Sequence, residues 1–154
     1  MKSMFQIIAA LACALTLTAC GGGGDDKPAD NTPAQPAFTK TDTVVGSGLE
    51  ASNGDLLTVH YTGWVYSATA TGNKGDQFET SRTGNPFSFT IGRGSVIPGW
   101  DQGILGMKPG GKRTLVIPAA MAYGAQQKTD ATGKVVIPAN SALVFEVELI
   151  SLSR

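Results

Sequence analysis

Alternation of apolar and polar residues over several short runs is the feature that most limits how this chain can fold. Leu57, Val59 and Tyr61 alternate with polar residues, and the same pattern runs through residues 143–149. Side chains of a β-strand point alternately to opposite faces, so a period of two predicts strands with one buried face. Turns that contain Gly or Pro separate these runs, as is typical of an antiparallel sheet. Shorter runs predict further strands at residues 41–45, 87–89 and 115–117.

One stretch has helical spacing instead. Trp100, Ile104 and Met107 recur near the period of an α-helix, and an acidic residue in the first turn complements the helix dipole. Gly99 before the stretch and Pro109 after it are the expected start and stop signals. The sequence therefore predicts an α+β fold, in which a curved antiparallel β-sheet wraps around one short α-helix.

The first 20 residues have the composition of a targeting segment. Lys2 is their only charge, and residues 5–17 form an apolar run that is shorter than the roughly 20 residues a membrane-spanning helix needs. A basic start followed by such a run predicts a secretory signal peptide. Residues 17–20, Leu-Thr-Ala-Cys, resemble the bacterial lipobox, which implies that Cys20 is acylated and becomes the new N-terminus. The alternative is an ordinary signal peptide that happens to contain Cys20.

Lipidation would attach the protein permanently to a membrane, since bacterial lipoproteins carry several acyl chains. Gly21 rather than Asp after the acylated residue favours the outer membrane, with the protein facing the periplasm or the cell surface. Residues 21–37 are rich in Gly, Asp, Pro and Ala and lack aromatic residues, so they predict a flexible linker. Residues 38–154 are then expected to form one domain.

Charge and cysteine content exclude several function classes for that domain. The chain has 12 basic and 12 acidic residues, which gives no sign of a nucleic-acid-binding patch. Its two cysteines, Cys13 and Cys20, both lie in the first 20 residues, so the predicted domain has no disulfide and no thiolate metal site. We therefore expect no metal, no cofactor and no nucleic-acid partner.

Three short strings carry the functional signal. They are His-Tyr-Thr-Gly at residues 60–63, Val-Ile-Pro-Gly-Trp at residues 96–100 and Ala-Tyr-Gly at residues 122–124. In this order, and with several phenylalanines between them, they resemble the FKBP-type peptidyl-prolyl cis-trans isomerases from about residue 39 to the C-terminus. The resemblance implies the same fold as the alternation does, a peptidyl-prolyl isomerase activity, proline-containing polypeptides as substrates and macrolide inhibitors as further ligands.

The resemblance also implies a single pocket with few charges. Trp100 would form its floor beneath the proline ring, and the Ile97 backbone N–H and the Tyr123 hydroxyl would each donate a hydrogen bond to a substrate carbonyl. Ile137 would lie on a long loop that overhangs the pocket. The remaining walls and rim would be formed by Tyr61, Phe78, Phe87, Val96 and Phe145.

Other conspicuous residues have more ordinary interpretations. Phe89, Leu115 and Val147 are predicted to be core, as buried aromatic and aliphatic residues usually are. His60 is predicted to hydrogen bond a backbone group. A hydrolytic triad is not indicated, because the chain has one histidine and no Gly-x-Ser-x-Gly string.

The chain departs from the family pattern at three places. Residues 78–82 read Phe-Glu-Thr-Ser-Arg, so the pocket carboxylate is Glu79 where the family often has Asp. The basic residue that commonly pairs with that Asp has no match, and altered macrolide affinity is expected. Residues 67–75 and 126–134 look like insertions relative to the shortest members. Both are predicted to be mobile surface loops that border the pocket and carry any substrate preference.

Three functional hypotheses follow from these observations. The first is a lipid-anchored prolyl isomerase that assists the folding of cell-envelope proteins. The second is a binding or chaperone module that holds proline segments without useful catalysis, which the Glu79 change would suit. The third is a surface-exposed factor that acts on host proteins. A monomer is expected, because related dimeric forms have a long N-terminal helical region that this sequence does not show.

Overall fold

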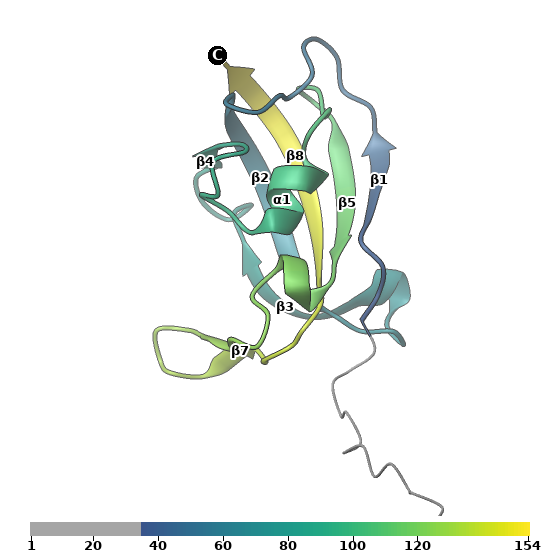
Figure 1. Cartoon of the computed structure of the whole chain (residues 1–154), viewed down its shortest axis with the longest axis vertical. Coiled ribbons are helices and arrows are strands. Elements are labelled where there is room, and N and C mark those ends of the chain that lie inside the picture. The colour runs from purple at the N-terminus through teal and green to yellow at the C-terminus, as the bar shows by residue number, and fades with distance from the viewer. Residues whose placement is uncertain (1–34) are drawn as a thin grey trace, which may run out of the picture. The chain divides into compact units, whose positions relative to one another are not determined.

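A computed structural model describes residues 35–154, and six of their strands form one antiparallel sheet (Figure 1). The strands along this sheet are ordered β1 (Thr39–Val44), β5 (Lys112–Ile117), β8 (Leu143–Ser153), β2 (Leu56–Tyr66) and β3 (Lys74–Thr80). A sixth strand, β4 (Phe87–Thr90), pairs with the first half of β2, whereas β3 pairs with its second half. The five predicted strands are therefore present, and β3 is an additional one.

The two long central strands, β2 and β8, show why the alternation predicted the sheet. Leu57 and Val59 of β2 and Leu149 of β8 are completely buried, whereas the polar residues Thr58 and His60 of β2 are half-buried. Phe89, Leu115 and Val147 are buried as predicted, with at most 5% of each side chain exposed. One face of the sheet thus carries the hydrophobic core.

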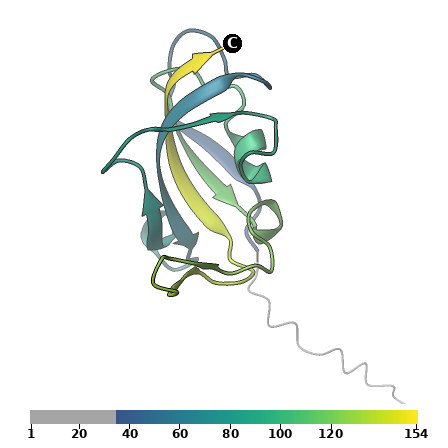
Figure 2. The ribbon, with the colours of Figure 1, turned by 90° about the vertical axis from the view of Figure 1, so that its left-hand side faces the viewer.

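Helix α1 (Pro98–Gly103) lies against this buried face (Figures 1 and 2). Two of its glycines let it approach β5 closely. A Cβ atom on Gly99 would lie 2.4 Å from Ile117 Cγ2, and one on Gly103 would lie 2.8 Å from Leu115 Cδ1. A side chain at either position would force the helix or these buried side chains to shift.

The helix is shorter than the spacing predicted: it ends at Gly103 with Ile104 as its C-cap, and residues 105–107 are no longer helical. Arg113 of β5 accounts for this ending. Its Nη1 donates hydrogen bonds to the carbonyl oxygens of Gly103 at 2.7 Å and Leu105 at 2.9 Å. Both carboxylate oxygens of Asp42 on β1 accept hydrogen bonds from the same guanidinium, at 2.6 and 2.9 Å. The buried Arg113 therefore connects the end of α1 to two strands of the sheet.

The two predicted loops contain regular secondary structure that the sequence did not predict. Residues 67–75 contain the short 3₁₀ helix η1 (Thr71–Asn73), and their last two residues already belong to β3. Residues 126–134 contain strand β6 (Lys128–Thr129), which pairs with β7 (Val135–Ile137) in a second, two-stranded sheet. A second 3₁₀ helix, η2 (Ala119–Met121), precedes this hairpin.

The predicted signal peptide, Cys20 and residues 21–34 of the predicted linker lie outside the described residues. Gln35 falls within the range predicted as linker, and it is hydrogen bonded to the domain. Its Oε1 accepts the Ala119 N–H at 2.8 Å, and its Nε2 donates to the Asn140 carbonyl oxygen at 3.0 Å. Within residues 35–154, no helix has the length and apolar character required to cross a membrane.

Candidate functional site

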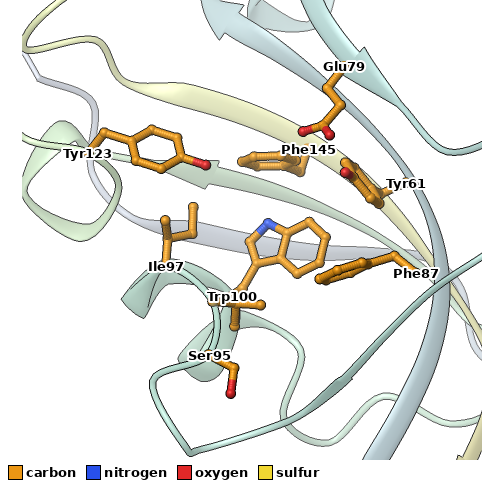
Figure 3. Close-up of a pocket in the computed structure, with 9 residues that line it drawn as sticks. Tyr61, Glu79, Phe87, Ser95, Ile97, Trp100, Tyr123 and Phe145 are labelled. Atoms are coloured by element: carbon orange, nitrogen blue, oxygen red, sulfur yellow. The ribbon is translucent and has the colours of Figure 1, made fainter. Parts of the chain in front are cut away.

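A cavity of about 240 Å³ opens beside α1, and aromatic side chains from five parts of the chain surround it (Figure 3). Its walls come from β2, β3, β4 and β8, from the segment that leads into α1, and from the loop after η2. This convergence explains why the three functional strings lie far apart in the sequence. The residues that line the cavity are Tyr61, Glu79, Phe87, Ser95, Val96, Ile97, Trp100, Tyr123 and Phe145.

Trp100 forms the base of the cavity, and only 4% of its surface is exposed. The edge of its indole meets the Tyr61 ring at a centroid distance of 5.0 Å and the Phe145 ring at 5.3 Å, both nearly perpendicular. Such edge-to-face pairs contribute stability beyond the burial of area. The floor is therefore an apolar surface packed closely against two aromatic walls.

The segment that leads into α1 is held by a carboxylate in the first turn of the helix. Asp101 accepts the backbone N–H groups of Gly92 at 2.9 Å and Gly94 at 3.0 Å. Both glycines have positive φ, at 76° and 67°, which other residues rarely adopt. Asp101 was predicted only to complement the helix dipole, and the structure shows that it also shapes the cavity wall.

The backbone N–H of Ile97 comes at the end of this segment, just before Pro98 begins the helix. Among the described residues, no acceptor is hydrogen bonded to it. The Trp100 Nε1 atom is likewise buried without a hydrogen-bond partner in the described part of the chain. In Figure 3 the indole nitrogen lies on the ring edge that is directed toward Tyr123 and Phe145.

Two tyrosine hydroxyls and one carboxylate supply the polar atoms of the upper wall (Figure 3). Burial, a hydrogen bond to Glu79 and the charge of that carboxylate together raise the pKa of the Tyr61 hydroxyl. Burial and the same negative charge raise the pKa of Tyr123. Both hydroxyls therefore stay protonated near neutral pH and can donate hydrogen bonds.

The backbone around Tyr61 is fixed by Ser81. The Ser81 hydroxyl oxygen accepts the Tyr61 N–H at 2.9 Å and lies 3.0 Å from His60 Nδ1. The prediction that His60 bonds a backbone group is therefore wrong, since its partner is a side chain. His60 thereby supports the strand behind the cavity without lining it.

Two of the predicted site residues lie elsewhere. Phe78 packs behind the cavity against Phe145, at a centroid distance of 5.6 Å, because both rings fill the space beside Gly63. Ile137 is 3% exposed and belongs to the hydrophobic core, since the hairpin turns it inward. Neither residue lines the cavity, and neither does any residue of the predicted loops 67–75 and 126–134.

The other predicted residues, Tyr61, Glu79, Phe87, Val96, Ile97, Trp100, Tyr123 and Phe145, all line the cavity. Ser95 also lines it and was not predicted. Its only signal in the sequence is its place directly before Val96. In residues 35–154, no group of three His, Cys, Asp or Glu side chains is arranged to hold a metal ion. The arrangement can enclose a small apolar ring, with hydrogen-bond donors at its edge for flanking carbonyls.

Comparison with known proteins gives consistent matches over the described domain. Residues 48–150 match the family described as FKBP-type peptidyl-prolyl cis-trans isomerase. An FK506-binding protein of Neisseria meningitidis serogroup A is 45% identical over 111 residues, which are 72% of this chain and 92% of that protein. FK506-binding protein 4 of Gibberella zeae is 41% identical over 128 residues, which are 83% of this chain but only 23% of that protein.

The fold comparison agrees with the sequence matches. The crystal structure of AtFKBP13 has a TM-score of 0.63 and 40% sequence identity to this chain, covering 75% of this chain and 93% of that one. The predicted α+β fold, a curved antiparallel sheet around one short helix, is therefore confirmed. This chain spans less than a quarter of the Gibberella zeae protein, so that protein contains much more than the shared domain.

Proposed function

The chain belongs to the FKBP-type peptidyl-prolyl cis-trans isomerase family, and from this premise we propose that it accelerates rotation about Xaa-Pro bonds in the cavity above Trp100. The observation that carries the proposal is the cavity itself, which has an aromatic floor and unoccupied hydrogen-bond donors at its edge. Its volume of about 240 Å³ suits one small ring with its flanking carbonyls.

The physical demand on such an enzyme is modest. Amide resonance sets a rotation barrier of roughly 18–20 kcal/mol, and no bond must be made or broken to cross it. In the transition state the amide is twisted and has lost much of its dipole. A surface with few charges therefore binds the twisted form better than either planar form. A thousandfold acceleration needs only about 4 kcal/mol of this preference.

Each part of the cavity has a role in this scheme. The Trp100 floor and the Tyr61, Phe87 and Phe145 walls would hold the proline ring away from water. The Ile97 N–H, which has no acceptor among the described residues, would bind one substrate carbonyl and leave the prolyl ring free to rotate against it. The protonated Tyr123 hydroxyl would bind a second carbonyl. No group has to exchange a proton with the substrate.

The test is cis-trans exchange of a short Xaa-Pro peptide, measured by NMR with the purified full chain in mild detergent. Exchange well above the uncatalysed rate, and reduced at least tenfold by Trp100→Leu, would support the proposal. Tyr123→Phe should reduce it by a smaller factor, because it removes one hydrogen bond. Tyr66→Phe is the matched control, since Tyr66 lies on β2 outside the cavity.

A non-catalytic module that only binds proline segments is the second candidate. Glu79 favours it, because this longer carboxylate is already engaged by the Tyr61 hydroxyl and so presents a polar edge to the floor. Peptide binding in the same titrations without any acceleration would establish this alternative. Recovery of exchange by Glu79→Asp would then identify the longer side chain as the cause.

We also propose that the chain is a bacterial lipoprotein acylated on Cys20 and assists folding of cell-envelope proteins, facing the periplasm or the cell surface. The support is the Leu-Thr-Ala-Cys string after an apolar run. Expression with a clickable palmitate analogue should label the protein. Cys20→Ser should abolish the label and release the protein from the membrane fraction, whereas Cys13→Ser should do neither. Protease treatment of intact cells would show whether it reaches the surface and could meet host proteins.

The names of its relatives support a further ligand. Several are FK506-binding proteins, so we propose that FK506 occupies the same cavity, with an affinity altered by Glu79. Competition between FK506 and a proline peptide in the NMR titration would test this. We propose a monomer, and sedimentation of the purified chain would test that.

A further inference from the structure

The β6–β7 hairpin places one cation beside the cavity. The ammonium of Lys128 lies 4.7 Å from the centroid of the Tyr123 ring, within the range of a cation–π interaction. Tyr123 is itself a wall of the cavity, and its hydroxyl points toward the centre in Figure 3. Lys128 thus packs on the ring of a side chain that would contact the substrate.

The pairing register explains why this lysine faces the domain. Lys128 on β6 is directly opposite Ile137 on β7, so the two side chains lie on the same face of the hairpin. Ile137 is 3% exposed and packs in the hydrophobic core. Lys128 is accordingly half-buried on the face that meets the domain, whereas Lys134 near the turn is exposed.

The hairpin that carries Lys128 is closed by its own hydrogen bonds. Asp130 accepts the Thr132 N–H at 2.8 Å, the Thr132 hydroxyl at 2.6 Å and the Lys134 N–H at 3.1 Å. These three contacts all engage the Oδ1 atom of Asp130 within the turn. In residues 35–154, no carboxylate forms an ion pair with Lys128. Its charge is therefore not neutralised by the protein that the structure describes.

The remaining charge at the cavity is of the opposite sign. Glu79 on β3 contributes a carboxylate beside Tyr61, and its charge also acts on Tyr123. Lys128 lies on the hairpin behind Tyr123. The wall formed by Tyr123 is thus the positive part of an otherwise apolar or negative site.

We propose that Lys128 is a specificity-determining residue, and that it makes the pocket prefer proline segments with an acidic side chain next to the proline. The inference rests on the proposed function of the cavity and names its substrate class. If a bound peptide carries a carboxylate that reaches past Tyr123, this carboxylate would form an ion pair with Lys128. An uncharged side chain cannot form that pair. A partly exposed pair of this kind corresponds to a preference of about two- to fivefold.

Two pairs of peptides test the proposal. The members of each pair differ only by Glu or Gln, placed directly before the proline in one pair and directly after it in the other. Exchange and binding are measured by NMR with the full chain in detergent, at low salt and again in 1 M NaCl. In at least one pair the wild type should prefer the Glu peptide by about two- to fivefold, and 1 M salt should remove most of the preference.

Three variants assign the preference to its source. Lys128→Met should abolish it, and Lys128→Arg should keep it because the cation remains. Lys134→Met removes a charge from the same hairpin outside the cavity and should leave the preference unchanged. Because the ion pair forms equally in the planar and twisted states, the change should appear in KM and not in kcat. A merely structural role, in which Lys128 only positions Tyr123, would instead lower kcat for Glu and Gln peptides alike.

The proposal would be overturned if the Glu and Gln peptides of both pairs bound and exchanged equally well. A preference for Glu that survives Lys128→Met would also overturn it. Failure of the proposed isomerase function would look different, since neither peptide of either pair would exchange faster than in buffer. Dissociation constants from the same titrations would then still report whether the Glu peptide binds more tightly. Absence of both binding and acceleration would overturn the isomerase and the acidic preference together.

Discussion

Helix α1 lines the cavity and the β6–β7 hairpin lies beside its Tyr123 wall, but the two elements are attached to the domain in different ways. The helix is held by long-range contacts, with Gly99 and Gly103 against β5 and the buried Arg113 at its end. The hairpin is held mainly by local hydrogen bonds within its turn, and Ile137 is its buried contact with the core. Elements at the same site can therefore differ widely in how much of the fold depends on them.

This difference suggests a division of roles. A change in α1 displaces Trp100, and with it both the core and the floor of the cavity. A change at the hairpin tip leaves the core intact and alters only what lies behind Tyr123. Catalysis would then depend on α1, whose sequence cannot change without damage to the core. Substrate selection would depend on the hairpin, whose sequence can change.

The largest expected effect tests whether the hairpin depends on one side chain. Ile137→Ala should lower the free energy of unfolding by about 2–4 kcal/mol, because it leaves a cavity in the core. Val135→Ala on the same strand should cost less than about 1 kcal/mol, since 40% of Val135 is exposed. Denaturant unfolding of both variants measures the contrast. Equal costs would show that the hairpin is bound to the domain along its whole length.

The next effect tests the close approach of α1. Gly99→Ala should cost about 1–3 kcal/mol, because its Cβ would lie 2.4 Å from Ile117 Cγ2 in the core. The displaced helix should also slow prolyl exchange. Gly84→Ala, which meets no atom within 4 Å, should leave both stability and exchange nearly unchanged. A stable Gly99→Ala variant with full activity would mean that the helix does not need this contact.

The same contrast explains how much the sequence could predict. The alternation of apolar residues such as Leu57 and Val59 predicted the strands, because the apolar character of each residue indicates whether its side chain is buried. The aromatic residues of the cavity were predicted through their family strings. Ile137 was misplaced because the register of the hairpin, which is not visible in its composition, turns this side chain inward.

Two long-range contacts at α1 were missed for a related reason. Arg113 occupies a core-facing position in the alternation with Leu115 and Ile117, so a polar residue there was a usable sign of a buried partner. The identity of its partners, Asp42 and the carbonyl of Gly103, depends on residues brought together only by the fold. The helix end at residue 103 could therefore not be predicted from helical spacing alone.

The pair between Arg113 and Asp42 gives a smaller, pH-dependent test of the helix attachment. A hydrogen bond from Arg113 is the main cause that lowers the pKa of Asp42 in the folded protein. The ionised carboxylate therefore stabilises the fold above its unfolded pKa of about 3.9, and this contribution is lost as pH falls through the lower folded pKa. Because 42% of the Asp42 side chain is exposed, Asp42→Asn should cost no more than about 1 kcal/mol at pH 7.

Unfolding measured from pH 7 to pH 2 checks the sign. The difference in free energy of unfolding between wild type and Asp42→Asn should stay constant down to about pH 5 and shrink below about pH 4. Glu50→Gln, which removes the more exposed contact to Lys108 at 3.6 Å, should show a much smaller difference throughout. A difference that grew in acid would contradict the stabilising role of the Arg113 pair.

The smallest expected effect on stability is at the hairpin turn. This prediction distinguishes the attachment of the hairpin most clearly from that of α1. Hydrogen bonds from the Thr132 side chain and backbone lower the pKa of Asp130, so its carboxylate is ionised and holds the turn at neutral pH. Asp130→Ala should leave the unfolding midpoint almost unchanged, because the residue is exposed and contacts only its own turn. It should nevertheless speed amide hydrogen exchange in residues 128–137 by about tenfold, since this turn opens locally without global unfolding.

Asp76→Ala removes an exposed acid from β3 and should leave that exchange unchanged. If Asp130→Ala lowered the unfolding midpoint as much as Gly99→Ala, the hairpin would be as integral to the fold as α1, and its proposed freedom to vary in substrate selection would be lost.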